Sequence, residues 1–336
     1  MNSNMNRDLI ETIVKKALRD VRDSPERNVR NLVDMALLFS TGQFQRQFFE
    51  IAQKTLRNEY SAYYPMIRDA AFFVSDQRLL TFGMNLGYNS LIAGADKIRA
   101  SDMDFHVPWS IAFEIDGASY WKKSSRYVSF IEEGARLGIF SWLVFTGAEP
   151  EKALPLAEAY PNHAFAIFCE PEGITSELVA AAESALNVMF VPRWNEETQN
   201  ACQTLRDARF LYSVYLQYCK EDEDNIFSGE VFSCAENLHP LFTMLYPSAD
   251  CAWKTRSKVY ERILHVRERQ QYKTVPWDLY FDGLYVDNAI SRAAHAVWFD
   301  RDGYFHMIPD RGNETRNLFE CALKEILRDA LPQAGG

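Results

Sequence analysis

Hydrophobic positions in the first part of the chain recur every three to four residues. Such stripes run from residue 10 to 21 and from 29 to 37, and two shorter ones follow before residue 76. A helix places positions with this spacing on one face. Ser24-Pro25 is typical of a helix start, because serine caps free N–H groups and proline fits the first turn. The pattern predicts an α-helical N-terminal module over residues 1–76.

From residue 77 the pattern changes to short β-rich apolar runs that alternate with amphipathic segments, which is typical of βα units. The predicted strands are Leu79–Phe82, Ser110–Ile115, Ile139–Phe145, Ala164–Cys169, Asn187–Val191 and Leu211–Leu216. The predicted helices between them are Tyr127–Leu137, Pro150–Ala159, Ser176–Leu186 and Glu196–Arg206. Six units favour an α/β fold with a partial (β/α)6-type barrel over residues 77–274, because a full eight-stranded barrel needs about 250 residues. A flavodoxin-like open sheet is the alternative.

The last part of the chain is less regular. The acidic run 220–224 is expected to be a solvated loop, since adjacent carboxylates repel each other. Helices are predicted near Glu230–Leu245 and Thr255–Gln271, followed by a connector rich in proline and aromatic residues. A hairpin with an Asp302-Gly303 turn and a helix then predict a small hairpin-helix C-terminal module over 275–336.

Composition narrows the function classes. The net charge of −10 and the pI near 5.2 argue against a nucleic-acid partner, which a basic face would attract. No apolar run reaches the roughly 20 residues that span a bilayer, and the first residues lack the apolar core of a secretion signal. We therefore expect a cytoplasmic protein without a membrane partner. The 6 cysteines are scattered without a CxxC pair, so we expect buried free thiols and no metal. The oligomeric state stays open.

The string Met84-Asn85-Leu86-Gly87-Tyr88-Asn89-Ser90-Leu91 resembles the cluster loop of the radical S-adenosylmethionine (radical SAM) superfamily. That loop reads Cys-x-x-x-Cys-x-x-Cys, often with Asn-Leu after its first cysteine. Asn85 and Leu86 are retained here, whereas Met84, Tyr88 and Leu91 replace the cysteines. An iron–sulfur cluster needs thiolate ligands, so the resemblance implies a fold without its cluster. The family's Gly-Gly-Glu motif, which grips S-adenosylmethionine, is replaced by residues 113–117, so this cofactor is not predicted either.

The C-terminal hairpin and the segment Asn317–Ile326 resemble the SPASM-type domain of peptide-modifying radical SAM enzymes. The cysteine that this domain carries after its hairpin falls near Ile308, so an auxiliary cluster is not expected. Together the two resemblances imply a pseudoenzyme that serves as an accessory factor and binds a peptide or a protein partner. An unrelated barrel or open sheet remains the alternative to this fold family.

Parallel βα folds collect functional side chains at the carboxyl ends of their strands. Applied to the predicted strands, this rule selects polar residues that could line a pocket for a peptide. These binding-pocket candidates are Asn85, Asn89, Glu114, Asp116, Thr146, Glu170, Arg193 and Tyr218. Carboxylates facing Arg193 could hold a cationic peptide or a metal through oxygen ligands. Alternatively, Arg193 and one acid form a neutral ion pair.

The same residues support a second hypothesis, a barrel enzyme that uses these acids and Arg193 for metal-assisted or general acid–base chemistry on a small molecule or peptide. No HxH or HxxxH spacing suggests a metal pair, and no catalytic residue can be assigned. A pocket lined by Glu114, Asp116, Glu170 and Arg193 would favour this enzyme or the binding of a small ligand. A space filled by Met84, Tyr88 and Leu91 would favour the pseudoenzyme.

Overall fold

The structure is a computed structural model that describes residues 3–39, 43–308 and 316–333. Its contacts divide the chain into two compact units. The first unit contains Met1–Leu80 and Phe190–Leu279, and the second contains Thr81–Met189 and Tyr280–Gly336. The division into three modules at residues 76 and 274 stays a prediction. No helix in the described parts of the chain is long and apolar enough to cross a lipid bilayer.

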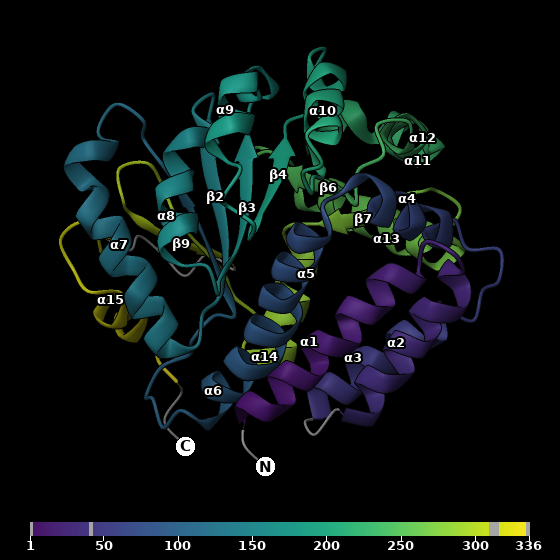
Figure 1. The fold of residues 1–336 in the computed structure, drawn as a ribbon. Coiled ribbons are helices and arrows are strands. Elements are labelled where there is room, and N and C mark those ends of the chain that lie inside the picture. The colour runs from purple at the N-terminus through teal and green to yellow at the C-terminus, as the bar shows by residue number, and fades with distance from the viewer. Residues whose placement is uncertain (1–2, 40–42, 309–315, 334–336) are drawn as a thin grey trace. The chain divides into compact units, whose positions relative to one another are not determined.

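The first unit begins with helices, as the hydrophobic stripes predict (Figure 1). These helices are α1 (Ser3–Asp20), α2 (Pro25–Phe39), α3 (Gln43–Thr55) and α4 (Tyr63–Phe73). Their apolar faces meet in one core, because each amphipathic helix must bury its stripe against another element. The buried members of this core are Val21, Val29, Leu56, Tyr64 and Ala71.

A three-stranded parallel sheet in the order β5-β6-β7 completes the first unit. The strands are β5 (Val214–Tyr218), β6 (Phe242–Pro247) and β7 (Val275–Asp278). The helices around them are α10 (Thr198–Asp207), α11 (Glu223–Ser228), α12 (Glu230–Glu236) and α13 (Trp253–Arg269). The predicted helix over 230–245 is thus wrong in its second half, where β6 begins, and the predicted connector contains β7. The acidic run is a 3₁₀ turn that leads into α11 rather than a loop.

The second unit contains most of a six-stranded sheet in the order β4-β3-β2-β1-β8-β9, whose strand β4 continues past Met189 into the chain segment of the first unit. Its strands are β1 (Ser110–Glu114), β2 (Ser141–Gly147), β3 (Ala164–Cys169), β4 (Val188–Pro192), β8 (Ala296–Phe299) and β9 (Phe305–Ile308). β1 runs parallel to both β2 and β8, whereas β9 pairs antiparallel with β8. Parallel strands alternating with helices confirm the predicted α/β class. The predicted bounds of β3 are also confirmed.

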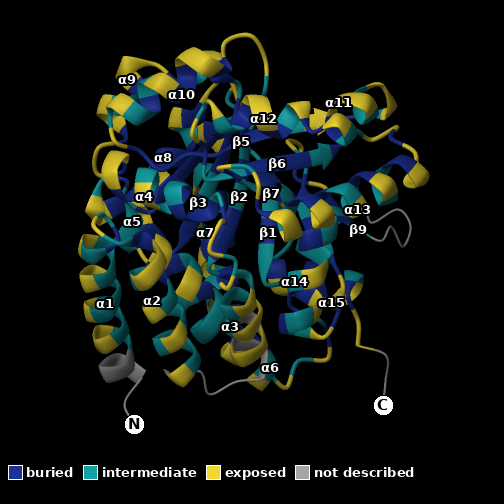
Figure 2. Cartoon of the chain, turned by 90° about the vertical axis from the view of Figure 1, so that its right-hand side faces the viewer, coloured by how far each residue is buried: buried dark blue, intermediate teal, exposed yellow. Residues whose placement is uncertain are grey.

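Helices lie between the parallel strands along the chain, and one more follows the hairpin; the strands themselves are largely buried (Figure 2). The helices are α7 (Tyr120–Leu137), α8 (Leu154–Ala159), α9 (Ser176–Ala181), α14 (Phe281–Ser291) and α15 (Leu323–Ala330). Phe113, Phe130 and Trp142 pack edge to face in the core, with ring centroids 5.3–6.2 Å apart. Every residue of β4 is buried, as expected of a parallel strand covered on both faces.

The first predicted strand is wrong. Leu79–Phe82 lies within helix α5 (Asp76–Met84), which continues as a π-helix, η1 (Asn85–Gly94), and as α6 (Ala95–Ala100). The string that resembles a cluster loop is therefore helical, and the first strand of the chain is β1. A four-residue apolar run cannot by itself distinguish a strand from the buried side of a helix.

The predicted C-terminal hairpin is confirmed by the antiparallel pairing of β8 with β9. Gly303 in its turn has a φ of 89°, and a Cβ there would lie 2.5 Å from the Phe319 ring. Only glycine accepts both the left-handed backbone and the close ring without strain. The helix that follows, α15, begins at Leu323 and so covers only the end of the predicted segment.

Candidate functional site

Charged side chains gather in the second unit where β1 and β8 end. The two strands are parallel neighbours with Phe113 opposite Phe299, so the residues that follow, Glu114 and Asp300, leave the sheet side by side. We call the group Glu114, Asp116, Asp300, Arg301 and His306 the strand-end face. The strand-end rule selects Glu114 and Asp116 but not the other three, because those belong to the predicted C-terminal hairpin rather than to a predicted βα unit.

Asp300 and His306 form the closest pair of this face. His306 Nε2 lies 2.8 Å from Asp300 Oδ2, and the imidazole stacks on the Trp298 ring at a centroid distance of 5.0 Å. Burial alone would raise the pKa of Asp300, but the His306 hydrogen bond and the backbone N–H groups of Asp302 and Tyr304 lower it below its ordinary value. The aspartate thus orients an imidazole that keeps 41% of its side-chain surface exposed.

Glu114 and Arg301 form a looser pair, with Arg301 Nε 3.9 Å from Glu114 Oε2. Partial burial raises the pKa of Glu114 above its ordinary value, and the positive charge of Arg301 opposes that rise. The arginine that faces Glu114 in this unit is therefore Arg301. Since 71% of its side chain is exposed, water screens much of this attraction.

The loops that follow β1, β2 and β3 pack closely onto one another. A Cβ on Gly117, after β1, would lie 1.6 Å from the Glu149 carboxylate, which comes from the loop after β2. A Cβ on Gly173, after β3, would lie 2.7 Å from Pro150. Asp116 accepts a hydrogen bond from the Ala118 N–H, which closes the first of these loops on itself. The strand-end loops are therefore packed against one another, and each glycine leaves room for a side chain of the next loop.

Thr146 and Glu170 follow the rule for strand ends but take part in backbone contacts. Thr146 Oγ1 is buried and donates to the Phe168 carbonyl at 3.2 Å, joining β2 to β3. The Glu170 N–H donates to the Gly147 carbonyl at 2.8 Å. Both residues thus help to hold the ends of two neighbouring strands together.

An exposed tryptophan stands near the strand-end face, on the first turn of α7. Trp121 keeps 70% of its surface exposed, and its ring lies against the buried Tyr120 at a centroid distance of 5.1 Å. Lys152 Nζ lies 5.5 Å from the Trp121 centroid and also pairs with Glu149 and Glu151. Sequence periodicity placed the helix start later, at residue 127, and so missed this side chain.

Two of the candidates, Arg193 and Tyr218, belong to the first unit. Arg193 directly follows β4, is exposed, and forms a parallel bridge with Tyr215. Tyr218 ends β5, is completely buried, and donates from its hydroxyl to Asp278 Oδ2 at 3.5 Å. Burial raises the pKa of Tyr218 far above its ordinary value, so the hydroxyl stays protonated. It is part of a core with Ile226 and other apolar residues rather than of an open pocket.

Asn85 and Asn89 do not follow a strand, contrary to prediction, and lie on the π-helix. Asn85 Nδ2 donates to the carbonyls of Pro161 and His163 at 2.8 and 2.9 Å, while Asn89 bridges Asn85 to Asn162. These carbonyls precede β3, so both asparagines hold the amino end of that strand. Their place is opposite to the functional edge that the rule assigned to them.

His163 continues this amino-end network. The Trp142 indole donates to His163 Nδ1 at 2.8 Å, and both side chains are buried. Burial lowers the pKa of His163 to about 4, because a charged imidazole would lose its hydration. His163 is thus a neutral structural acceptor.

Asp287 on α14 is a buried carboxylate that the sequence analysis did not select. It accepts hydrogen bonds from the N–H groups of Trp109 and His295 at 3.0 and 2.9 Å, and from the Ser291 hydroxyl at 3.0 Å. Trp109 precedes β1 and His295 precedes β8, so one carboxylate joins the amino ends of both strands. Burial raises the pKa of Asp287 to about 7, although its hydrogen bonds act in the opposite direction.

The six cysteines are all free, and only Cys169, Cys202 and Cys251 are buried. The expectation of buried thiols therefore holds for half of them. Within the described ranges, no group of three or more histidine, cysteine or acidic side chains could hold a metal ion.

No protein-family model and no curated protein matches this chain. Among solved structures, the chain is similar to three crystal structures of Streptococcus suis SuiB. They are SuiB, SuiB bound to S-adenosylmethionine, and SuiB bound to the precursor peptide SuiA. The identity is 10%, with TM-scores of 0.47 and 0.48. The similarity covers 89% of this chain and 80–81% of the SuiB chain.

Proposed function

We propose that this chain is a radical SAM-like pseudoenzyme without a cluster, which acts as an accessory factor by binding a peptide or protein. The resemblance in the sequence supports the family, and the replacement of its ligands by Met84, Tyr88 and Leu91 supports the missing cluster. The loop after β1, residues 115–119, also contains no cysteine. Without thiolates the chain cannot ligate an iron–sulfur cluster at either place.

The packing of the strand-end loops is the observation that carries this proposal. In a parallel βα fold a substrate pocket opens at the carboxyl ends of the strands. Here the Glu149 side chain lies on Gly117, and Pro150 lies on Gly173, so the protein itself takes up space at this edge. Met84, Tyr88 and Leu91 were expected to fill it, but they lie on helices, and the loops take that role instead.

Trp121 is the proposed centre of the binding surface. Tryptophan is enriched among residues that dominate binding energy, because it buries a large rigid ring. The charges beside this ring are mixed: Lys122 and Lys123 follow Trp121 on α7, and Lys152, which pairs with Glu149 and Glu151, lies against the ring. A peptide with one large apolar side chain matches the exposed ring, and polar groups of either charge on that peptide have partners beside it.

Anaerobic purification with iron reconstitution tests the missing cluster. We expect substoichiometric iron and no reductive cleavage of S-adenosylmethionine. Stoichiometric [4Fe–4S] absorbance together with that cleavage would refute the pseudoenzyme.

A random-peptide display screen against the full chain tests the binding surface. We expect selected peptides to share a large apolar side chain, and Trp121→Ala to weaken their binding at least tenfold. Trp253→Ala is the matched control, because Trp253 is 60% exposed but lies on α13. Equal losses in the two variants, or binding unaffected by Trp121→Ala, would exclude this surface.

A second candidate function is general acid–base catalysis at the strand-end face, favoured by the Asp300–His306 hydrogen bond of 2.8 Å. An exposed imidazole oriented by a carboxylate can serve as a general acid or base. Here Arg301 would take the part that the sequence analysis gave to Arg193. Hydrolysis of a panel of p-nitrophenyl esters that His306→Gln abolishes would favour catalysis, whereas equal rates in both proteins would exclude it for that panel.

A further inference from the structure

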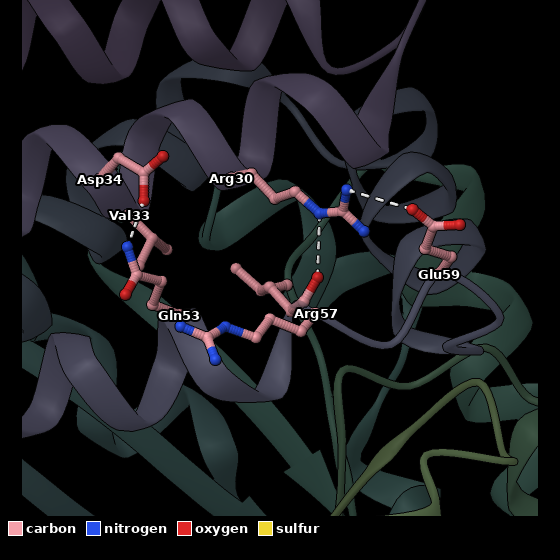
Figure 3. A pocket seen from close by; sticks show the side chains of 7 residues that line it. Arg30, Val33, Asp34, Gln53, Arg57 and Glu59 are labelled. Atoms are coloured by element: carbon pink, nitrogen blue, oxygen red, sulfur yellow. Dashed lines mark hydrogen bonds and ion pairs between the residues drawn. The ribbon is translucent and has the colours of Figure 1, made fainter.

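The helical part of the first unit contains an open cavity of 360 Å³ (Figure 3). Helix α2 contributes Arg30, Val33 and Asp34, the end of α3 contributes Gln53, and the next segment contributes Leu56, Arg57 and Glu59. Its volume falls within the range of about 300–1,000 Å³ that is usual for small-molecule sites. The cavity is independent of the strand-end face, which belongs to the second unit.

Arg30 is held in place before any ligand arrives. Its Nε donates to the Leu56 carbonyl and to the Tyr64 hydroxyl, both at 2.9 Å, and its guanidinium lies 5.6 Å from the Tyr64 ring centroid. Arg30 Nη1 also lies 4.0 Å from Glu59 Oε1. A guanidinium fixed by several partners contributes a preorganised positive charge to the wall, at little further entropic cost.

One turn further along α2, Asp34 adds a negative charge to the same wall. Gln53 Nε2 donates to Asp34 Oδ1 at 2.8 Å, which orients the carboxylate but does not neutralise it. The Arg57 side chain extends along the cavity toward Gln53 in Figure 3, and within the described residues no hydrogen bond or ion pair to its guanidinium is found. Among the described residues, the cavity thus presents an exposed arginine and an exposed aspartate that are in no ion pair, together with the apolar side chains of Val33 and Leu56.

We propose that this cavity binds a small zwitterion with an apolar side chain, either a free amino acid or a dipeptide. Arg57 would take the carboxylate, since a guanidinium matches a carboxylate with two parallel hydrogen bonds. Asp34 would take the ammonium group, and Val33 with Leu56 would contact the apolar side chain. A polyanion such as phosphate is disfavoured because Asp34 and Glu59 would repel it, and a simple cation is disfavoured by the two arginines.

Isothermal titration calorimetry of the full chain tests this proposal with leucine and leucyl-leucine as probes. N-acetyl-leucine and leucinamide are the controls, because each retains the side chain and only one of the two charges. We expect at least one zwitterion to bind tenfold more tightly than either control. If leucine binds more tightly than leucyl-leucine, the ligand is a free amino acid; if the reverse holds, it is a dipeptide. No binding, or equal binding of zwitterions and controls, would overturn the proposal.

Variants of the lining residues provide the second arm. Arg57→Gln and Asp34→Asn should each weaken binding of the zwitterion at least tenfold, and Arg57→Lys should weaken it less than Arg57→Gln. Lys54→Gln, which removes an exposed cation from α3 outside the cavity, should leave binding unchanged. Circular dichroism melts confirm that each variant is folded, and a folded Arg57→Gln variant with unaltered affinity would contradict the assignment.

Discussion

The two edges of the six-stranded sheet treat polar residues in opposite ways. At the amino edge Asp287, His163 and Asn85 are buried and bonded to backbone or core groups. At the carboxyl edge Arg301 and His306 keep much of their surface in water. A buried polar group costs free energy unless it is paired, so the first edge joins strands together, while the second keeps charged side chains in water.

Among these variants, Asp287→Ala should lower the free energy of unfolding most. This change leaves the buried N–H of His295 and the partly buried N–H of Trp109 without their acceptor, whereas the Ser291 hydroxyl keeps the Asp287 backbone carbonyl. We therefore expect a loss of about 3 kcal/mol in the free energy of unfolding. Chemical denaturation measures it. Asp116→Ala at the carboxyl edge is the matched control and should change stability by no more than about 0.5 kcal/mol. Similar losses in both variants would abolish the distinction between the edges.

Asn85→Ala sharpens the comparison by testing a residue that had been expected to bind ligand. The change removes two hydrogen bonds to the loop before β3, which should cost about 2 kcal/mol in a denaturant titration. Binding of the selected peptides should stay within a factor of two of the unaltered protein. A folded variant of normal stability that has lost peptide binding would restore the original functional assignment.

The pH dependence of stability should reveal two opposing groups at the amino edge. Because the pKa of Asp287 is raised to about 7, the folded state binds the extra proton between about pH 4 and 7, and this group makes stability fall as pH rises. Because the pKa of His163 is lowered to about 4, the unfolded state binds the extra proton between about pH 4 and 6.5, and this group makes stability rise with pH.

Single variants separate the two contributions, each of which reaches at most about 1.4 kcal/mol per pH unit. Relative to the unaltered protein, Asp287→Asn should become more stable as pH rises from 5 to 7, and His163→Gln less stable. Denaturant unfolding at pH 5, 6 and 7 gives both differences. Parallel profiles for all three proteins would mean that neither group titrates as its burial indicates.

Arg301→Ala should have the smallest effect on stability, no more than about 0.5 kcal/mol, because its pair with Glu114 is exposed and screened. The pKa of Glu114 should nevertheless rise, since the charge of Arg301 lowers it. Carboxyl chemical shifts followed by NMR measure this titration. Arg136→Ala, whose pair with Glu132 lies on α7, is the control and should leave the Glu114 titration unchanged.

Much of the second unit could be predicted from apolar runs bounded by turn residues, including β3 and the hairpin around Gly303. The strand-end rule also found Glu114. The errors have a common origin in short segments. Leu79–Phe82 is apolar enough for either a strand or a helix, and β7 is only four residues long and contains Pro276, which weakens any strand prediction.

The sequence by itself determined the alternation of helices and parallel strands, the acidic character, and the absence of thiolates from the string 84–91, because periodicity, charge and residue type are local properties. Only the tertiary structure decided that Asn85 serves the amino end of β3, that Arg301 and His306 join Glu114, and that Glu149 covers Gly117. Those relations connect residues far apart in the chain, and they depend on strand order and burial, which no local pattern encodes.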